Sequence, residues 1–401
     1  MAGSPMVVLT SENTIDATYG RWEDDGSSPF FPVVERNDAF RVDTSLGRDL
    51  MMFGSCDYLG LSQRPELAEA SIQAIRDFGT NTYGAQLLIG HTRIHHELED
   101  RLSTLHPDYV GLLFPSGMAA NLAVIPALVG KEDVILADRK DHVSIFMGAT
   151  LSGAEVRTFA HNDMNKLEAL LQRTQTKRSR YIIVDGLYSA DGDHAPMRVI
   201  AELAERYDAR IIVDEAHSFA IVGPTGLGVA EHDDALERVD IIVGTMSKAL
   251  GSTGGFVLTR PEIERTLRYL APSYTSSRGN APAVAAASLA AFAVLEREGD
   301  TLRDLLARNV QHVLPQLRSR GFNILDTVSH IVPLIVGDET KTVEAAGALI
   351  KRGIFTATFL YPHVPAGLGR LRIGLSAAHS TDDCAQLIDA LADVRDEVGF
   401  A

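Results

Sequence analysis

Residues 241–256, IIVGTMSKALGSTGGF, join a strand-like apolar run to a glycine-rich turn that holds one lysine. Lys248 is unusual at such a place, because lysine side chains usually point into water. One interpretation makes it a loop cation without a task, and the other makes it an amine placed for chemistry. The strand-like runs elsewhere in the chain decide between the two.

Short apolar runs rich in β-branched residues recur through the first part of the chain. They cover residues 110–114, 133–137, 181–185, 210–214, 240–245 and 255–259. A polar turn and an amphipathic stretch follow each of the first four, as in a parallel sheet covered by helices on both faces. The sequence therefore predicts an α/β fold with a mostly parallel sheet, and places ligands beyond the carboxyl ends of the strands.

The pattern changes after residue 282. We expect helices over residues 283–297, 302–320 and 382–398, and strands over residues 330–336, 355–359 and 369–374. The prediction is thus an N-terminal segment over 1–61, a large domain over 62–282 and a smaller α+β domain over 283–401. The N-terminal segment is expected to pack against the smaller domain or to reach a partner subunit.

Composition excludes several classes of protein. A chain of 401 residues that is 45% hydrophobic can bury a large core, and its net charge of -16 argues against binding to nucleic acid or to anionic membranes. Cys56 and Cys384 are far apart and indicate neither a disulfide framework nor a metal site. No secretory signal or membrane span is recognisable, so we expect a cytoplasmic protein.

The run RIIVDEAHSF, residues 210–219, ends in Asp214 and carries His217 three residues later. A lone acid at a strand end most often caps the next element. It can instead hold a protonated heterocyclic nitrogen, and His217 can hydrogen-bond the same ligand. Taken with Lys248 at the end of the next strand, the second interpretation prevails. A carboxylate at a pyridinium nitrogen and a Schiff-base lysine are what pyridoxal phosphate requires.

The stretch FPSGMAANLAV, residues 114–124, offers a phosphate site where a strand passes into a helix. Ser116 by itself predicts a helix cap, but the N–H groups of such a turn also bind phosphate, and Gly117 allows close approach. Thr245 and Ser247 can add hydroxyl donors beside the lysine.

Four further positions are ambiguous alone: two follow strands, and two lie on a strand. His142 is either a turn residue or a flat ring that stacks on a cofactor, and Ser189 is a small hydroxyl past a strand end. Arg370 and Arg372 lie on one face of the strand in GRLRIGLSAAH; one of them can fork onto a substrate carboxylate, although paired arginines are usually on the surface.

These motifs resemble the α-oxoamine synthases, fold-type-I enzymes that depend on pyridoxal phosphate. The resemblance runs from DYLGLSQRPEL at residue 57 to RLRIGLSAAH at residue 379, with the motifs in the family's order. Lys248 looks like the Schiff-base lysine, and Asp214 is similar to the acid at the pyridine nitrogen. Arg372 resembles the arginine that grips the amino-acid carboxylate.

The resemblance also implies roles for the smaller positions. His217 and Ser189 would bond the phenolic oxygen of the cofactor, and His142 would stack on its ring. Gly117 and Met118 fall in the phosphate-binding turn, which Thr245 would reach from beside the lysine. Ser276, in YTSSRGN, would donate to the phosphate across the interface of a homodimer.

The implied activity is a condensation of a small amino acid with an acyl thioester, usually acyl-CoA, with loss of CO2 to give an α-aminoketone. Lys248 would remove the α-proton, and the ring held protonated by Asp214 would stabilise the carbanion. The amino acid, the acyl chain and the choice between CoA and a carrier protein stay open, as does decarboxylation itself.

Three departures from the family's pattern affect the substrate. Cys56 stands where an asparagine often precedes the DYLG motif, and Gln86 replaces an arginine on the acyl side. Gly279 and Asn280 replace a pair of prolines in an interface loop. We therefore expect Cys56 and Gln86 near the substrate, and an unusual substrate rather than one of biotin synthesis.

Other functions stay open beside this one. An aminotransferase or lyase can use the same fold, because fold does not determine reaction. A non-catalytic partner subunit would not need Lys248, Asp214 and His217 together. A dinucleotide-binding dehydrogenase would need a glycine fingerprint that FPSGMAAN lacks.

Overall fold

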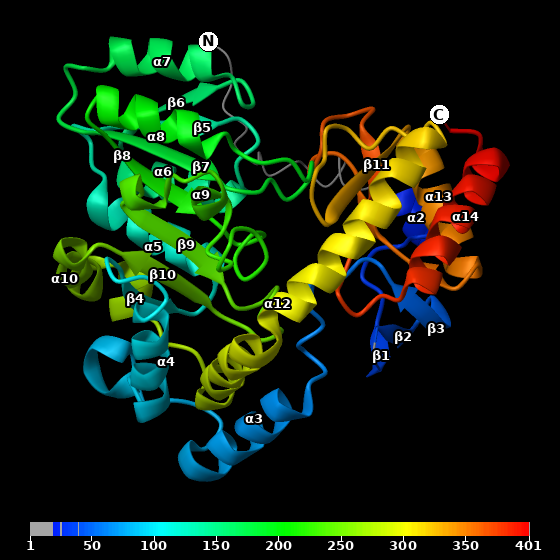
Figure 1. The fold of residues 1–401 in the computed structure, drawn as a ribbon, viewed down its shortest axis with the longest axis horizontal. Coiled ribbons are helices and arrows are strands. Elements are labelled where there is room, and N and C mark those ends of the chain that lie inside the picture. The colour runs from blue at the N-terminus through cyan, green and yellow to red at the C-terminus, as the bar shows by residue number, and fades with distance from the viewer. Residues whose placement is uncertain (1–18, 25, 39, 401) are drawn as a thin grey trace. The chain divides into compact units, whose positions relative to one another are not determined.

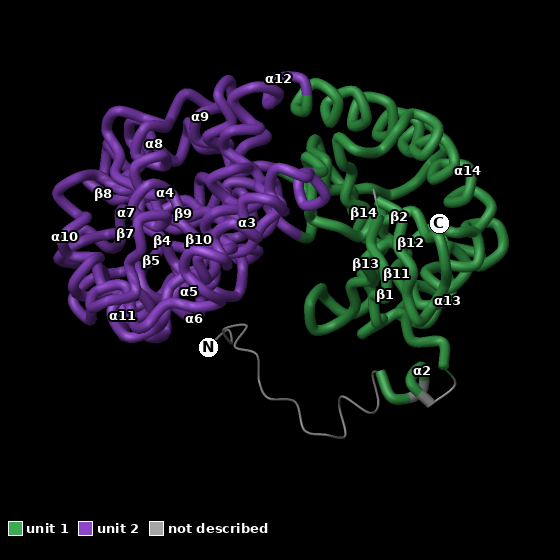
Figure 2. Tube along the Cα trace, turned by 90° about the horizontal axis from the view of Figure 1, so that it is seen from below, with its two compact units in different colours: residues 1–60, 190–193, 302–401 green, residues 61–189, 194–301 purple. Residues whose placement is uncertain are grey.

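The computed structural model describes residues 19–24, 26–38 and 40–400 of the chain (Figure 1). They divide into two compact units (Figure 2). Unit 1 holds Met1–Gly60, Ala190–Asp193 and Leu302–Ala401, and unit 2 holds Leu61–Ser189 and His194–Thr301. The predicted domain boundaries at residues 61 and 282 stay a prediction.

Unit 2 is built on a seven-stranded sheet, in the order β4-β10-β9-β8-β7-β5-β6. Its strands are β4 (Val110–Phe114), β5 (Val134–Asp138), β6 (Glu155–Phe159), β7 (Arg180–Asp185), β8 (Ala209–Asp214), β9 (Ile241–Thr245) and β10 (Gly255–Thr259). β10 runs antiparallel to both of its neighbours, while the pairs from β9 to β6 are parallel. The predicted α/β class with a mostly parallel sheet is confirmed.

The sequence foresaw every strand of this sheet except β6. Five of the six predicted strands are buried along almost their whole length, because helices cover both faces. β6 lies at the edge and is only half-buried, and its sequence EVRTF places charges at every second position. A single half-buried edge strand has too weak a pattern to stand out from a helix or a loop.

Unit 2 also contains helices, of which several pack on the sheet. They are α3 (Pro65–Phe78), α4 (Arg93–Ser103), α5 (Gly117–Leu128), α6 (Val143–Ser152), α7 (Met164–Arg173), α8 (Met197–Arg206), α9 (Val229–His232), α10 (Pro261–Leu270) and α11 (Pro272–Thr275), with short turns at Gln86–Gly90 and Leu236–Arg238. α5 packs on β4, β9 and β10, α7 on β5 and β6, and α8 on β8. This packing holds the carboxyl ends of the strands in place, and the candidate site residues lie in the turns that follow those ends.

Unit 1 contains two small sheets. One has the order β1 (Val34–Asp38), β2 (Arg41–Thr44), β3 (Gly47–Met52), β12 (Ile354–Phe355), and the other β11 (Ile331–Gly337), β14 (Gly369–Gly374), β13 (Ala357–Phe359). Its complete helices are α2 (Arg21–Asp24), α13 (Glu339–Lys351) and α14 (Thr381–Val398). β3 pairs with β12 in parallel, which confirms that the N-terminal segment packs against the C-terminal part of the chain.

Two details of the predicted C-terminal part are wrong. The strand expected over residues 355–359 is two strands, because β12 pairs with β3 whereas β13 pairs with β14. The two helices expected over 283–297 and 302–320 are one helix, α12 (Pro282–Ser319). Gly299 lies between the two expected helices, but one glycine costs a helix only about 1 kcal/mol, which the cooperative helix on either side tolerates.

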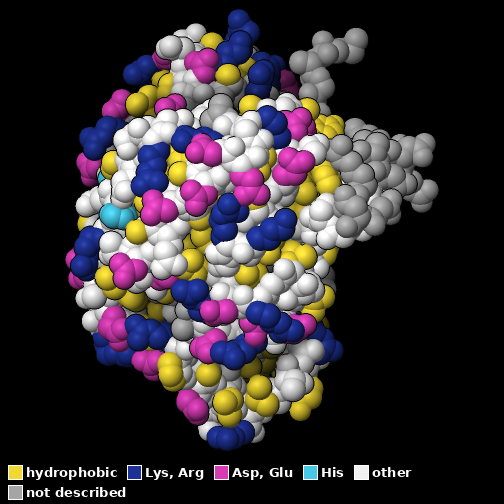
Figure 3. All heavy atoms as spheres, turned by 90° about the vertical axis from the view of Figure 1, so that its right-hand side faces the viewer, with side chains coloured by type: hydrophobic (Ala, Val, Ile, Leu, Met, Phe, Trp, Pro, Cys, Tyr) yellow, Lys and Arg dark blue, Asp and Glu magenta, His cyan; other side chains and the backbone are white. Residues whose placement is uncertain are grey.

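The surface agrees with the acidic but mixed composition. On the face drawn in Figure 3, basic and acidic side chains are interspersed instead of gathering by sign. Among the described residues, no helix combines the length and the apolar character that crossing a bilayer requires.

Candidate active site

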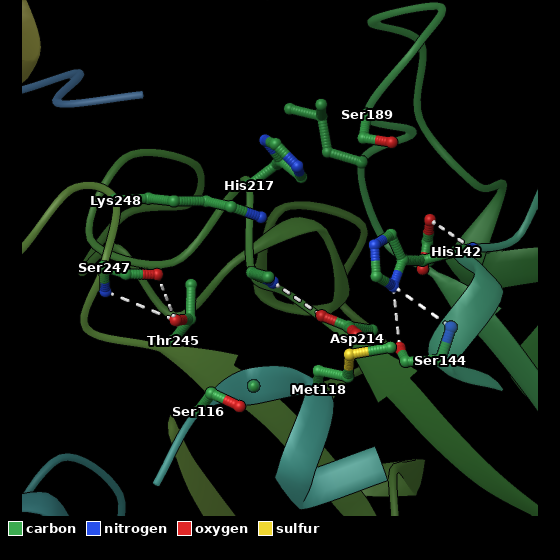
Figure 4. Close-up of a pocket in the computed structure, with 14 residues that line it drawn as sticks. Ser116, Met118, His142, Ser144, Ser189, Asp214, His217, Thr245, Ser247 and Lys248 are labelled. Atoms are coloured by element: carbon green, nitrogen blue, oxygen red, sulfur yellow. Dashed lines mark hydrogen bonds between the residues drawn. The ribbon is translucent and has the colours of Figure 1, made fainter. Parts of the chain in front are cut away.

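A pocket of about 240 Å³ lies in unit 2, where five strands end (Figure 4). Its lining comes from the turns after β4, β5, β7, β8 and β9. The residues are Ser116, Gly117, Met118, His142, Ser144, Asp185, Leu187, Ser189, Asp214, Ala216, His217, Thr245, Ser247 and Lys248. The carboxyl-end position expected for a ligand site in an α/β sheet is therefore where the pocket lies.

One wall of the pocket is the first turn of α5. Ser116 caps this helix, and its Oγ accepts a hydrogen bond from the Ala119 N–H at 3.0 Å. A side chain at Gly117 would bring its Cβ to 3.3 Å from Thr245 Cβ, which is tighter than ordinary contact. The first N–H groups of a helix lack partners within the helix, so this crowded turn suits a phosphate.

Beside this turn, the hydroxyls of Thr245 and Ser247 are 2.7 Å apart. Thr245 Oγ1 donates to the Gly254 carbonyl at 2.7 Å, so the Ser247 hydroxyl is the donor between the two. Both side chains are thereby held at the edge of the pocket, next to Lys248.

Asp214 is almost fully buried at the end of β8. Its Oδ2 accepts from Asn121 Nδ2 at 2.7 Å, and its Oδ1 accepts from the Ala216 N–H at 3.0 Å. Two fixed donors hold this carboxylate rigidly in place. Such a group can hold a proton on a ligand nitrogen.

His142 begins α6, where the turn after β5 ends. Its Nδ1 lies 2.7 Å from Ser144 Oγ, and its backbone N–H donates to Asp185 Oδ2 at 3.1 Å. Desolvation by the surrounding protein lowers the pKa of His142, and the charge of Lys248 adds to this while Asp214 opposes it. The ring is therefore neutral around pH 7, which suits stacking on a flat ligand.

Lys248 is half-buried in the turn after β9, and its side chain extends toward the middle of the pocket (Figure 4). His217, which is buried, and Ser189 line the same space from the turns after β8 and β7. The structure thus brings together Lys248, Asp214, His217, His142, Ser189 and the predicted phosphate turn.

Sequence reasoning missed Asp185, Ser144 and Asn121. Asp185 is buried next to Asp214 on the parallel strand β7, and desolvation together with the charge of Asp214 raises its pKa well above the usual range. A signal for it exists, because IIVD occurs both at 182–185 and at 211–214. Asn121 and Ser144 are neutral residues within helical patterns and carry no such signal.

Four predicted site residues do not line this pocket. Gln86 is buried, and its Nε2 donates to the Leu113 carbonyl of β4 at 2.9 Å. Ser276 is exposed. Cys56 and Arg372 belong to unit 1, where Arg372 Nη2 lies 3.0 Å from Cys56 Sγ.

The structure distinguishes the two arginines of β14. Arg370 is committed to a buried ion pair with Asp191, and also donates to the Ala190 carbonyl at 3.0 Å. Arg372 is also buried, but contacts a thiol and lies over the Phe359 ring at 5.2 Å. Arg370 thus binds a carboxylate, and Arg372 binds a thiol and an aromatic face.

Comparison with known proteins adds independent findings. Residues 48–391 match the family model described as aminotransferase class I and II. An 8-amino-7-oxononanoate synthase of Geobacter metallireducens is 38% identical over 354 residues, which are 88% of this chain and 90% of that relative. A protein of the same name from Cellvibrio japonicus is 38% identical, with 88% and 89% covered.

Solved structures are also similar. A serine palmitoyltransferase of S. paucimobilis, solved with an aldimine of pyridoxal phosphate and myriocin, matches with a TM-score of 0.93 at 27% identity, over 98% of this chain and 100% of that one. The Sphingomonas wittichii serine palmitoyltransferase matches with a TM-score of 0.93 at 28% identity, over 98% and 99%.

Proposed function

The chain belongs to the aminotransferase class I and II family and, within it, to the α-oxoamine synthases, and we propose that it condenses a small amino acid with an acyl-CoA, with loss of CO2, to an α-aminoketone. It is a pyridoxal phosphate-dependent acyltransferase. The observation that carries the proposal is the pocket of unit 2, where Lys248, Asp214 and a capped helix start converge.

The residues of this pocket fit pyridoxal phosphate. The crowded turn at Gly117 and Met118, with Thr245 and Ser247 beside it, would hold the phosphate. Asp214 would hold the ring nitrogen and His142 would stack on the ring. His217 and Ser189 would bond the phenolic oxygen, and Lys248 would form the Schiff base.

Each of these residues then has a chemical task. The cofactor, when bound, supplies an electron sink for the carbanion formed at the amino-acid α-carbon. Lys248, freed when the amino group of the substrate takes its place, would accept the α-proton, and Asp214 would keep a proton on the ring nitrogen because a buried carboxylate stabilises the charge there. His142 excludes water from one face of the ring.

Arg372 would bind the carboxylate of the amino acid. A buried guanidinium, held by a thiol and an aromatic face, offers the fork that a carboxylate matches. Cys56 would then lie next to the substrate and is a weaker hydrogen-bonding group than an amide. This contact supports a substrate that differs from that of the named relatives.

The assembly is also part of the proposal. A homodimer would let Ser276 reach the phosphate of the partner's site, which agrees with its exposure in the single chain. Cys56 and Cys384 form no disulfide, which suits a reducing cytoplasm. The side chain of Gln86 is hydrogen-bonded to β4. That Gln86 lies near the acyl donor therefore stays a prediction.

A matrix of substrates tests this function. Purified protein with pyridoxal phosphate is mixed with glycine, alanine or serine and with acyl-CoAs of increasing length, while free thiol and CO2 are measured. Equal release of thiol and CO2 for one pair supports the condensation, whereas amino exchange with a keto acid and no thiol would make it an aminotransferase. Efficient turnover of pimeloyl-CoA would contradict the expectation that the substrate differs from that of biotin synthesis.

A further inference from the structure

A continuous set of short hydrogen bonds joins the carboxylate of Asp214 to the ring of His142. Asn121 Nδ2 donates to Asp214 Oδ2 at 2.7 Å and to Ser144 Oγ at 2.9 Å. Ser144 Oγ lies 2.7 Å from His142 Nδ1. Asn121 and Ser144 are fully buried, so water does not replace these bonds.

The direction of every bond in this set follows from its two ends. An ionised Asp214 can only accept, so the amide nitrogen of Asn121 faces it; a flipped amide would place an oxygen against the carboxylate. The same nitrogen donates its second hydrogen to Ser144 Oγ. The serine hydroxyl, having accepted there, donates its own hydrogen to His142 Nδ1.

A second donor points at the same ring atom. The backbone N–H of Ser144 also reaches His142 Nδ1, at 3.3 Å (Figure 4). A hydrogen on Nδ1 would face two donors at once, so Nδ1 accepts and the ring hydrogen sits on Nε2.

We propose that Asn121 and Ser144 are positioning residues that transmit the charge of Asp214 to His142 and fix its ring as the neutral tautomer with hydrogen on Nε2. This inference rests on the proposed function in one respect, since it gives His142 a cofactor ring to face. A neutral imidazole stacks on a protonated pyridine ring without the repulsion that an imidazolium would meet. Asn121 and Ser144 touch no ligand in this scheme and act only through the other two residues.

Other charged groups around His142 do not change this assignment. Lys248 disfavours a proton on the ring, whereas Asp214 favours one, and burial outweighs the latter. Asp185 bonds the backbone N–H of His142 and not its ring.

Nitrogen NMR of the full chain labelled with ¹⁵N-histidine tests the proposal, first without and then with pyridoxal phosphate. Chemical shifts of the two ring nitrogens report which one carries hydrogen, and a His142→Gln variant identifies the signal. The expected result is hydrogen on Nε2 with at least about a tenfold preference, because hydrogen bonds of this kind contribute on the order of 1.4 kcal/mol. Hydrogen on Nδ1 in the parent protein overturns the proposal.

The variant Asn121→Asp reverses the direction of the bonds. The new aspartate shares one proton with Asp214, because two carboxylates in contact cannot both ionise, and its oxygen accepts from the Ser144 hydroxyl. That hydroxyl then accepts from His142, so hydrogen should move to Nδ1. Asn309→Asp is the matched control, since Asn309 Nδ2 also donates to two oxygens but lies in unit 1. An unchanged tautomer in folded Asn121→Asp contradicts the proposal.

Ser144→Ala keeps the test decisive if Asn121→Asp does not fold. It leaves only the backbone N–H at Nδ1, so the tautomer preference should fall several-fold, whereas Ser152→Ala at the other end of α6 should leave it unchanged. Identical His142 signals in Ser144→Ala and the parent would refute the hydroxyl bond. The NMR experiment and the thiol assay test the two proposals separately. If the predicted tautomer is found but no thiol is released, the hydrogen-bond network is supported and the proposed function is contradicted. If thiol is released but the tautomer is the other one, only the network is contradicted.

Discussion

At the scale of single residues, Asp214 determines how charge is arranged in the pocket. It is held by two donors and lies next to Asp185 on the neighbouring strand. Burial, and then the charge of Asp214, raise the pKa of Asp185 well above its usual value, so the neutral form of Asp185 is favoured beside Asp214.

Replacing Asp214→Asn should reduce kcat by about a hundredfold or more, while KM for the amino acid changes only a few-fold. The lost charge matters most when the carbanion forms and less when the substrate binds. Steady-state kinetics measures both. Asp185→Asn is the matched control and should cost far less, because burial and the charge of Asp214 favour the neutral form of Asp185, which an amide resembles. Equal losses in the two variants would argue against the special role of Asp214.

Arg372→Ala should raise KM for the amino acid by about 10- to 100-fold, since a hydrogen-bonded charge pair contributes roughly 1.5–3 kcal/mol. KM for the acyl thioester should change little. Varying each substrate at saturation of the other separates the two. A change confined to the acyl donor would show that Arg372 does not bind the amino-acid carboxylate.

Residues with an uncommon side chain for their place were predictable from the sequence. Lys248 in a glycine-rich turn and Asp214 at the end of an apolar run belong to this class, and both line the pocket. Asn121 and Ser144 were not predictable, because their importance comes from which atoms they touch across three elements. Gln86 was expected near the substrate because the resemblance places an arginine there. The sequence did not reveal that its side chain is hydrogen-bonded to β4.

At the scale of elements, helix starts connect stability to ligand binding. Ser116 caps α5 at the pocket, and Ser380 caps α14 in unit 1 by the same kind of bond, in which the serine Oγ accepts from a backbone N–H. The two helices differ in that only α5 begins at the proposed phosphate position.

The variants Ser116→Ala and Ser380→Ala should each lower the free energy of unfolding by about 1 kcal/mol, the usual cost of losing a cap. Only Ser116→Ala should also weaken the binding of pyridoxal phosphate, by several-fold, because its cap orients the first turn of α5. Urea unfolding and a fluorescence titration with the cofactor measure the two effects. Equal cofactor affinity in both variants would show that the first turn of α5 does not bind the phosphate.

Elements with a strong periodic pattern were predictable, and connections between them were less so. The central strands of unit 2 follow from their apolar runs, whereas edge strand β6 is hidden by its alternating charges. The continuity of α12 and the division between β12 and β13 depend on which partners the chain meets, and local sequence does not contain that information.

At the scale of the whole molecule, the pH dependence of stability reports on unit 1. His379 is buried against Phe53, its Nδ1 accepts from the Ser376 N–H at 3.1 Å, and burial lowers its pKa to about 4. The unfolded chain binds a proton at this histidine near pH 6.5, so between pH 6.5 and 4 it holds more protons than the folded chain. Stability from His379 is present above this window and is lost as pH falls through it.

His379→Gln should therefore flatten the fall of unfolding free energy between pH 6.5 and 4, by as much as about 3 kcal/mol across the window. Urea unfolding at several pH values measures this. His312→Gln, a half-exposed position on α12, serves as control and should keep the parent's slope. The same slope in all three proteins would mean that His379 is not held neutral by the fold.

The central claim is that Lys248 and pyridoxal phosphate together join an amino acid to an acyl thioester. The most direct measurement follows visible absorbance of the cofactor-loaded protein while an amino acid and then an acyl-CoA are added, with free thiol recorded in parallel. We expect a band that one amino acid shifts and thiol release on adding acyl-CoA, with both responses absent in folded Lys248→Ala. Thiol release that persists in Lys248→Ala, or a parent protein that takes up no cofactor, would contradict it.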